Sequence, residues 1–276
     1  WYKNAIADRE VMDAAWYDLD PVESYRDYAM WWYKKTLETG AMDQMYWDDL
    51  FLTPNTNLVG TDAYLRDDGT IQPATGIFSL RELIRRSAYM MTEMGRIPRF
   101  VLHMTSTNLA PVLSYGAMNF DWEENLGFID FQDRHTREYI RAMSHGRQSG
   151  NFPIMLVATT SDPQKTLSKK EYQHWIRTAA GVMLTHELRW HKDYPEFWNT
   201  LKRLYDLGYA TEGSKEYNYW EENYPVSITG GETSSLVSAR NKRAVVMVCD
   251  WGEGGNYVMT VDKKQLGLPE KLEAFN

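Results

Sequence analysis

Apolar residues along the chain follow two patterns, one typical of helices and one typical of buried strands. The first is a recurrence every three or four residues, which predicts amphipathic helices. These segments are residues 21–39, 80–94, 134–143, 169–178 and 195–207. The second is a short, nearly continuous apolar run, which predicts a buried strand. These runs are residues 42–52, 99–104, 117–120, 152–158 and 181–184.

The two kinds of segment alternate, which is typical of an α/β protein with parallel strands. Polar and acidic residues follow the strands, at the end where the active site of a β/α-barrel lies. We therefore expect residues 1–208 to be the C-terminal part of a TIM-type β/α-barrel. A closed barrel has eight strands, so an N-terminal part of the same protein, or another chain, is expected to complete it.

After residue 208 the pattern changes to short strands separated by glycine-rich or charged turns. The strands are predicted at residues 215–217, 226–229, 236–240, 244–249 and 257–261. Several short strands with regular turn signals are typical of an antiparallel β-sandwich. We expect residues 209–276 to form this second, smaller module.

Composition narrows the class of partner. The net charge of -8 argues against nucleic acid as a partner, because phosphate binding needs a basic surface. The chain contains 11 Trp and 18 Tyr, whose rings can stack on sugars while their polar atoms bind hydroxyl groups. No transmembrane stretch is visible, and the single Cys249 is expected to be a buried apolar side chain. We expect a secreted or periplasmic protein whose signal peptide is not visible in this sequence.

The first acidic strand end is the strongest candidate for chemistry. Tyr46 and Trp47 lead directly into Asp48 and Asp49, and Asn55 follows in the next loop. Successive strand residues point to opposite faces, so one of the two aspartates is expected to face the site. The alternative is a pair that only caps a helix or fixes a loop. Asn55 suits a sugar hydroxyl or a plain turn.

A second acidic group follows the strand at residues 117–120 and contains Asp121, Trp122 and Glu123. Glycoside cleavage usually needs two carboxyl groups, one as general acid and one as nucleophile, base or stabiliser. Trp122 would raise the pKa of a neighbouring carboxyl by excluding water. The alternative is a solvated loop.

Four further residues are predicted to hold the substrate. His103 closes a strand, and His186 with Glu187 is expected at the end of the strand predicted at 181–184. Arg147 lies in a glycine-bounded loop and suits a carboxylate or sulfate. For each of them a structural role is the alternative. The pair at 186 and 187 does not continue into a zinc-binding HExxH motif, and neither a metal nor a cofactor is predicted.

In several of these segments, the sequence resembles bacterial proteins related to glycoside hydrolase family 123. The resemblance runs from about Ala41 to the C-terminus, and its strongest part is the run Tyr46-Trp47-Asp48-Asp49. Further parts are Val101-Leu102-His103-Met104-Thr105, the step from Asp121 to Glu123, Arg141 to Gln148, and Val245 to Trp251. It implies a barrel followed by a sandwich, and cleavage of N-acetylgalactosaminides through an adjacent Asp-Glu pair. Asp48-Asp49 stands where that pair is expected.

Two main hypotheses follow. In the first, the chain is a glycoside hydrolase with Glu123 as general acid and Asp48 or Asp49 as nucleophile or stabiliser. In the second, it binds carbohydrate without cleaving it, since the Asp-Glu pair is missing. A structural or assembly role is a third possibility.

Overall fold

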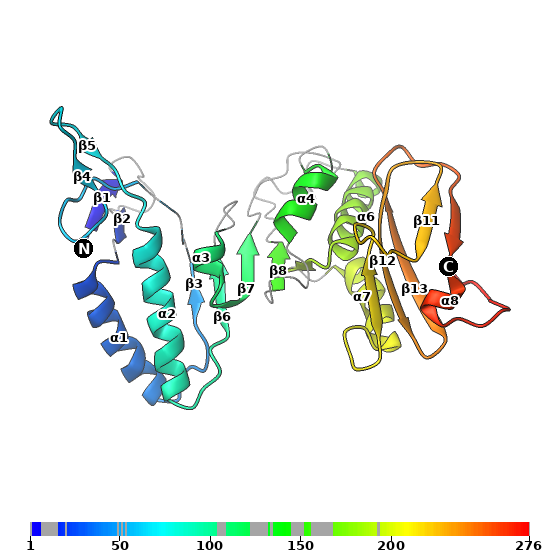
Figure 1. The fold of residues 1–276 in the computed structure, drawn as a ribbon, viewed down its shortest axis with the longest axis horizontal. Coiled ribbons are helices and arrows are strands. Elements are labelled where there is room, and N and C mark those ends of the chain that lie inside the picture. The colour runs from blue at the N-terminus through cyan, green and yellow to red at the C-terminus, as the bar shows by residue number, and fades with distance from the viewer. Residues whose placement is uncertain are drawn as a thin grey trace. The chain divides into compact units, whose positions relative to one another are not determined.

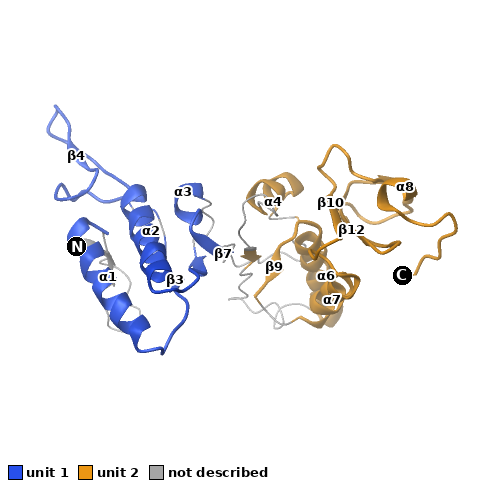
Figure 2. Ribbon diagram, turned by 60° about the horizontal axis from the view of Figure 1, so that its bottom comes forward, with its two compact units in different colours: residues 1–121 blue, residues 122–276 orange. Residues whose placement is uncertain are grey.

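The structure is a computed structural model, and it divides into two compact units. It describes residues 2–6, 16–19, 21–48, 50, 52, 54–103, 109–121, 132, 135–144, 152–155, 168–191 and 194–275. The first unit is residues 1–121 and the second is residues 122–276 (Figure 2). Each unit is described separately.

In its described residues, the first unit combines three helices with parallel and antiparallel strands (Figure 1). Its helices are α1 (Glu23–Glu38), α2 (Ile77–Glu93) and α3 (Ala110–Leu113). Its parallel strands, in spatial order, are β3 (Tyr46–Trp47), β6 (Phe100–His103) and β7 (Gly116–Asp121). Its antiparallel pairs are β1 (Tyr2–Ile6) with β2 (Trp16–Leu19), and β4 (Tyr64–Leu65) with β5 (Ile71–Gln72).

The three parallel strands bury one face against the helices. Phe100 and Leu102 of β6 belong to the same hydrophobic cluster as Ile84 and Met91 of α2. Residues between them point to the other face, because side chains alternate along a strand. On that other face Met118 of β7 is exposed. The sheet therefore has a helix-covered face and a second, more open face.

The described part of the second unit also combines helices with parallel and antiparallel strands. Its helices are α4 (Arg137–Ser144), α6 (Lys169–Thr185), α7 (Pro195–Leu207) and α8 (Lys263–Leu266). Strands β8 (Phe152–Met155) and β9 (Arg189–Trp190) are parallel. An antiparallel sheet has the order β10 (Lys215–Asn218), β12 (Thr233–Arg240) and β13 (Arg243–Asp250). Strand β11 (Val226–Thr229) pairs with β14 (Val258–Val261).

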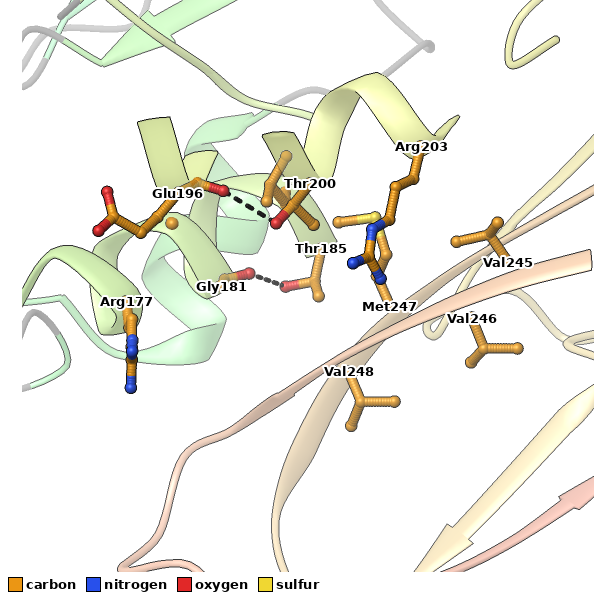
Figure 3. A pocket seen from close by; sticks show the side chains of 12 residues that line it. Arg177, Gly181, Thr185, Glu196, Thr200, Arg203, Val245, Val246, Met247 and Val248 are labelled. Carbon is orange, nitrogen blue, oxygen red and sulfur yellow. Dashed lines mark hydrogen bonds between the residues drawn. The ribbon is translucent and has the colours of Figure 1, made fainter. Parts of the chain in front are cut away.

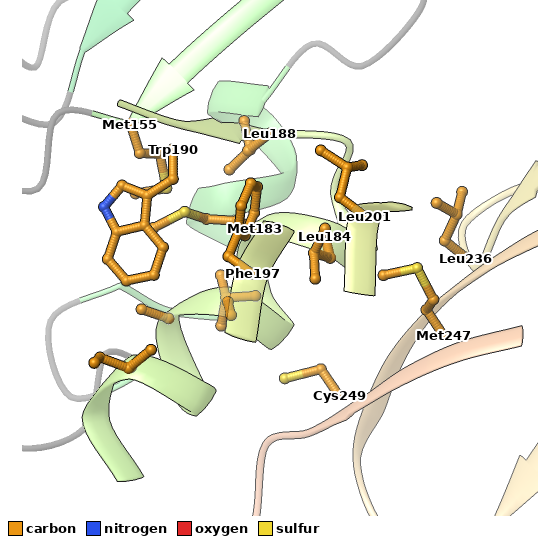
Figure 4. Packing of buried hydrophobic residues seen from close by; sticks show 14 of the residues in the cluster. Met155, Met183, Leu184, Leu188, Trp190, Phe197, Leu201, Leu236, Met247 and Cys249 are labelled. Carbon is orange, nitrogen blue, oxygen red and sulfur yellow. The ribbon is translucent and has the colours of Figure 1, made fainter. Parts of the chain in front are cut away.

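Helices α6 and α7 pack on one face of strands β12 and β13 (Figure 4). Trp175 and Phe197, one from each helix, are fully buried in this cluster. Leu236 and Met247, which are paired across β12 and β13, contribute the sheet side of this cluster. The opposite face of the two strands contributes Val237 to a separate cluster that also contains Val226 of β11. Apolar burial on both faces makes this sheet the centre of the second unit.

The predicted class is confirmed at the level of a mixed α/β protein that contains both parallel and antiparallel strand pairings. Five strands take part in parallel pairings among the described residues, and a complete barrel, which needs eight, is not shown. The β-sandwich stays a prediction. So does the boundary after residue 208, although α6, α7 and the C-terminal strands share one hydrophobic cluster.

Two predicted strands differ from the structure. Among the described residues between 42 and 52, the strand consists of Tyr46 and Trp47 alone. Residues 181–184, predicted as a strand, are the last turn of α6. Their run is apolar on every side because this part of α6 is buried all round, so its periodicity does not distinguish a helix from a strand. Ser168 and Glu171 begin α6 with a capping box, which favours one continuous helix.

Gly181 explains how closely α6 approaches β13. A Cβ atom at this position would lie 2.9 Å from Sγ of Cys249. We predict that Gly181→Ala is destabilising in the wild-type background, although alanine is favoured over glycine in a helix by about 1 kcal/mol. In a Cys249→Ala background the same change should stabilise. Chemical denaturation of the four variants should give a coupling free energy of about 1–2 kcal/mol, and additive effects would contradict this close contact.

Candidate functional site

Two backbone hydrogen bonds to β6 fix the position of the first acidic strand end. Val101 N–H donates to the Met45 carbonyl at 3.1 Å, and Leu50 N–H donates to the His103 carbonyl at 3.0 Å. Between these two bonds Tyr46 pairs with Val101 in parallel register. This alignment brings Asp48 to the carboxyl end of β6, where His103 ends the strand.

Tyr46, Asp48 and His103 form one polar cluster on the open face of the sheet. The Tyr46 hydroxyl donates to Oδ1 of Asp48 at 3.1 Å. Nδ1 of His103 lies 2.8 Å from the same Oδ1 and 2.7 Å from the Tyr46 hydroxyl oxygen. All three polar atoms are thus within hydrogen-bond distance of one another. The carboxylate favours a proton on Nδ1 of the imidazole.

The cluster is buried at its base and exposed at its tip. The His103 side chain is 5% exposed, whereas that of Asp48 is 57% exposed. Tyr46 is 50% exposed. A ligand can therefore reach the carboxylate and the tyrosine ring, while the histidine supports both from below.

Phe120 of β7 adds an aromatic wall that was not proposed from the sequence. Its ring lies edge-on to Tyr46 with centroids 6.0 Å apart, and edge-on to His103 at 6.1 Å. Phe120 pairs with His103 in the parallel register, which places both side chains on one face. The register of neighbouring strands was the missing signal, since the sequence alone does not show which residue of β7 lies beside His103.

Asn55 is not part of this cluster. It is fully buried, and its side-chain amide donates to the Ala74 carbonyl at 3.3 Å. Its side-chain oxygen accepts from the Asn57 backbone N–H at 3.2 Å. These bonds hold the loop that follows the acidic strand end, as turn chemistry predicts.

His186 lies in the second unit, at the C-terminal cap of α6 and not at the end of a strand. Its imidazole is fully buried. Nδ1 lies 2.8 Å from the Val182 carbonyl oxygen, and Nε2 lies 3.1 Å from the Tyr219 hydroxyl oxygen. The ring stacks on Trp220 with centroids 5.8 Å apart. The contacts to a carbonyl and a hydroxyl fit a neutral imidazole that donates from Nδ1 and accepts at Nε2.

Burial lowers the pKa of His186 from its ordinary 6.5 to about 4. The hydrogen bond to the Val182 carbonyl opposes this decrease, whereas two nearby positive charges lower the pKa further. They are Arg137, whose guanidinium lies 5.7 Å from the Tyr219 ring, and Arg141, which lies 5.7 Å from the Trp220 ring. The surroundings therefore disfavour the charged form of His186.

Glu187 forms the turn between α6 and β9. Its φ of 61° is in the left-handed region, which residues with side chains adopt rarely. The Glu187 carboxylate is buried and accepts a hydrogen bond from the Tyr209 hydroxyl. Burial, followed by the charge of Glu187, raises the pKa of Tyr209 well above its usual range. These contacts tie the end of α6 to the residues that follow α7.

Five further candidates have side chains that lie outside the described residues. Asp121 ends β7, but its side chain, like residues Asp49, Trp122, Glu123 and Arg147, lies outside the described part of the chain. No group of three histidine, cysteine, aspartate or glutamate side chains among the described residues is arranged to hold a metal ion. Of the residues predicted from the sequence, the structure thus brings together Tyr46, Asp48 and His103.

Comparison of the chain with known protein families, with curated proteins and with solved structures finds no match. Among the helices that the structure describes, none has the length and apolar character needed to cross a bilayer.

Proposed function

We propose that the chain is a glycoside hydrolase whose sugar-binding site lies at the carboxyl ends of β3, β6 and β7. One observation carries the proposal: Tyr46, Asp48 and His103 converge there on the open face, with the carboxylate exposed. Sugars are bound by aromatic rings and by groups that exchange hydrogen bonds with hydroxyls, and this cluster offers both. The parallel strands are proposed to belong to a β/α-barrel, whose active site lies at this end.

Asp48 is assigned the role of nucleophile or of stabiliser of the positive charge that develops on the sugar ring. Its hydrogen bonds to Tyr46 and His103 support this role, because they fix the orientation of the carboxylate. The general acid, which protonates the leaving oxygen, is assigned to Glu123. The stereochemical outcome depends on the distance between the two carboxyl groups, about 5 Å for retention and about 6.5–9.5 Å for inversion.

The assignment is tested by measuring product release from a panel of oligosaccharides, including N-acetylgalactosaminides. We expect the wild type to cleave at least one of them and Glu123→Gln to lose at least about 100-fold in kcat. Glu212→Gln, which changes an exposed glutamate of the second unit, is the control. Full activity of Glu123→Gln on a cleaved glycan would show that the general acid is another residue.

A carbohydrate-binding protein without catalysis is the second candidate. The observation in its favour is that Asp48-Asp49 replaces the Asp-Glu pair that the family resemblance implies. Calorimetry that detects binding of a glycan, together with no product release from the same glycan, would select this function. Any cleavage that Asp48→Asn abolishes would exclude it.

A further inference from the structure

Among the strands that the structure describes, none pairs with the outer edge of β13. In the sheet order β10-β12-β13, this strand has one neighbour and is the last of the three. It is one of the two longest described strands, Arg243–Asp250. Edge strands are commonly protected by lysine, proline or a bulge. The stretch from Ala244 to Cys249 contains neither lysine nor proline, and its pairing with β12 has no break in register.

The hairpin between β12 and β13 determines which backbone groups face outward. Its two turn residues, Asn241 and Lys242, both have positive φ, as in a type I′ turn. Arg240 and Arg243 are therefore a hydrogen-bonded pair, and every second pair after it is hydrogen-bonded as well. The bond from Trp251 N–H to the Glu232 carbonyl at 2.9 Å, at the other end of the two strands, fits the same alternation of bonded and non-bonded pairs.

In this alternation, Val246 and Val248 belong to the non-bonded pairs, so their N–H and C=O groups point away from β12. No hydrogen bond of these groups exists among the described residues. Val248 is also 45% exposed. The outer edge thus offers two donors and two acceptors in the spacing that an added strand requires.

A groove runs along this edge, with a volume of ≈ 280 Å³ (Figure 3). It is lined by all four residues from Val245 to Val248. Consecutive residues point to opposite faces of a strand, so a hollow that touches all four follows the edge and not one face. Its other wall is formed by α6 and α7, which contribute Arg177, Glu196 and Arg203.

The charges of the groove indicate the kind of segment that fits. Arg177 and Arg203 are both exposed, and neither makes an ion pair with any described residue. Glu196 offsets one of the two positive charges at most. A guanidinium binds a carboxylate through a planar, two-pronged contact, so an acidic side chain on the added segment would complement the groove.

We propose that the outer edge of β13 binds an extended segment of a partner protein by strand addition, and that this segment carries an acidic side chain. The backbone groups of Val246 and Val248 pair with the segment, and Arg177 and Arg203 hold its carboxylate. Backbone pairing of this kind supplies affinity, while the charged wall supplies selectivity. The site is separate in its chemistry from the sugar site and does not depend on that proposal.

The probe is a short capped peptide of alternating valine and threonine with one central glutamate, tested on the whole chain by calorimetry. We expect this peptide to bind at least about threefold more tightly than its counterpart with lysine in place of glutamate. A third peptide, methylated on alternate backbone nitrogens, should bind at least about tenfold more weakly, because it cannot donate to the edge. Equal binding of all three peptides, or no binding, would overturn the proposal.

A matched pair of variants tests the charged wall. Arg203→Gln should weaken binding of the glutamate peptide by about two- to fivefold. Lys202→Gln, which removes the same charge from the neighbouring position outside the groove, should leave binding unchanged. Equal effects of both variants would show a general charge effect and not a site.

Amide exchange locates the bound peptide without any substitution. The Val246 and Val248 amides should become protected when the peptide is added, whereas the Val245 and Met247 amides, which bond to β12, should change little. Protection of Val246 and Val248 without peptide, rising with protein concentration together with a dimer in sedimentation, would assign the edge to a second copy of the chain and overturn the proposal.

Discussion

Asp48→Asn is expected to lower the rate of glycan cleavage by at least about 100-fold while leaving the fold intact. The new side chain keeps the shape of aspartate and still accepts a hydrogen bond from Tyr46, but it has no negative charge. It therefore neither attacks the sugar nor stabilises the positive charge on it. Because the Asp48 side chain is 57% exposed, its replacement leaves little buried structure unsupported. Product release measured at saturating glycan checks the effect on kcat.

Asp43→Asn is the matched control for this prediction. Asp43 belongs to the same unit, its side chain is 87% exposed, and it forms an ion pair with Arg96 at 2.9 Å. Removal of this charge changes the net charge by the same amount without touching the proposed site. We expect Asp43→Asn to cleave at the wild-type rate. Retained cleavage by Asp48→Asn, or an equal loss in both variants, would contradict the role of Asp48.

The second large effect is a loss of stability in mild acid that originates at His186. Its pKa is about 4 in the folded chain, chiefly because it is buried, and 6.5 is the ordinary value. Between these two values the unfolded chain binds the proton and the folded chain does not. The contribution of His186 is therefore fully present above pH 6.5, decreases as the pH falls, and is lost near pH 4. The total is about 3 kcal/mol, from 1.36 kcal/mol per pKa unit.

Denaturant unfolding between pH 7 and pH 4 measures this slope. We expect His186→Gln, which keeps a donor and an acceptor, to have a shallower decline than the wild type. His174→Gln is the control, because it removes a histidine that is exposed on α6. An NMR titration of the wild type provides a second readout: the His186 ring should stay neutral at pH 5. A charged His186 in the folded chain at that pH would contradict the prediction.

Helix α7 shows how far the sequence alone leads. Its bounds, Pro195–Leu207, agree with the predicted ones, because proline favours the first helical position and Gly208 adopts the left-handed conformation that ends a helix. Residues 181–184 show the limit. An apolar run that is buried on all sides shows neither the helical nor the strand periodicity of polar residues. Its helical state is determined by packing against β13.

The candidate site, too, was predictable only where local sequence pattern determines it. Alternation along a strand predicts that only one of Asp48 and Asp49 faces the site, and the contacts of Asp48 with Tyr46 and His103 place it on the open face. The register that brings Phe120 to His103 depends on strand pairing between distant residues. The burial of His186 was not predictable either, since the rings of Tyr219 and Trp220 that cover it come from a distant segment.

The measurement that tests the central claim most directly is an NMR titration of the whole chain with the glycan that the panel identifies. The ring signals of His103 report on the cluster at the ends of β3 and β6, and those of His174 report on an unrelated surface. We expect saturating glycan to shift the His103 signals and to leave the His174 signals in place. Asp48→Asn should weaken this response. Binding or cleavage of the glycan with unchanged His103 signals would contradict this expectation.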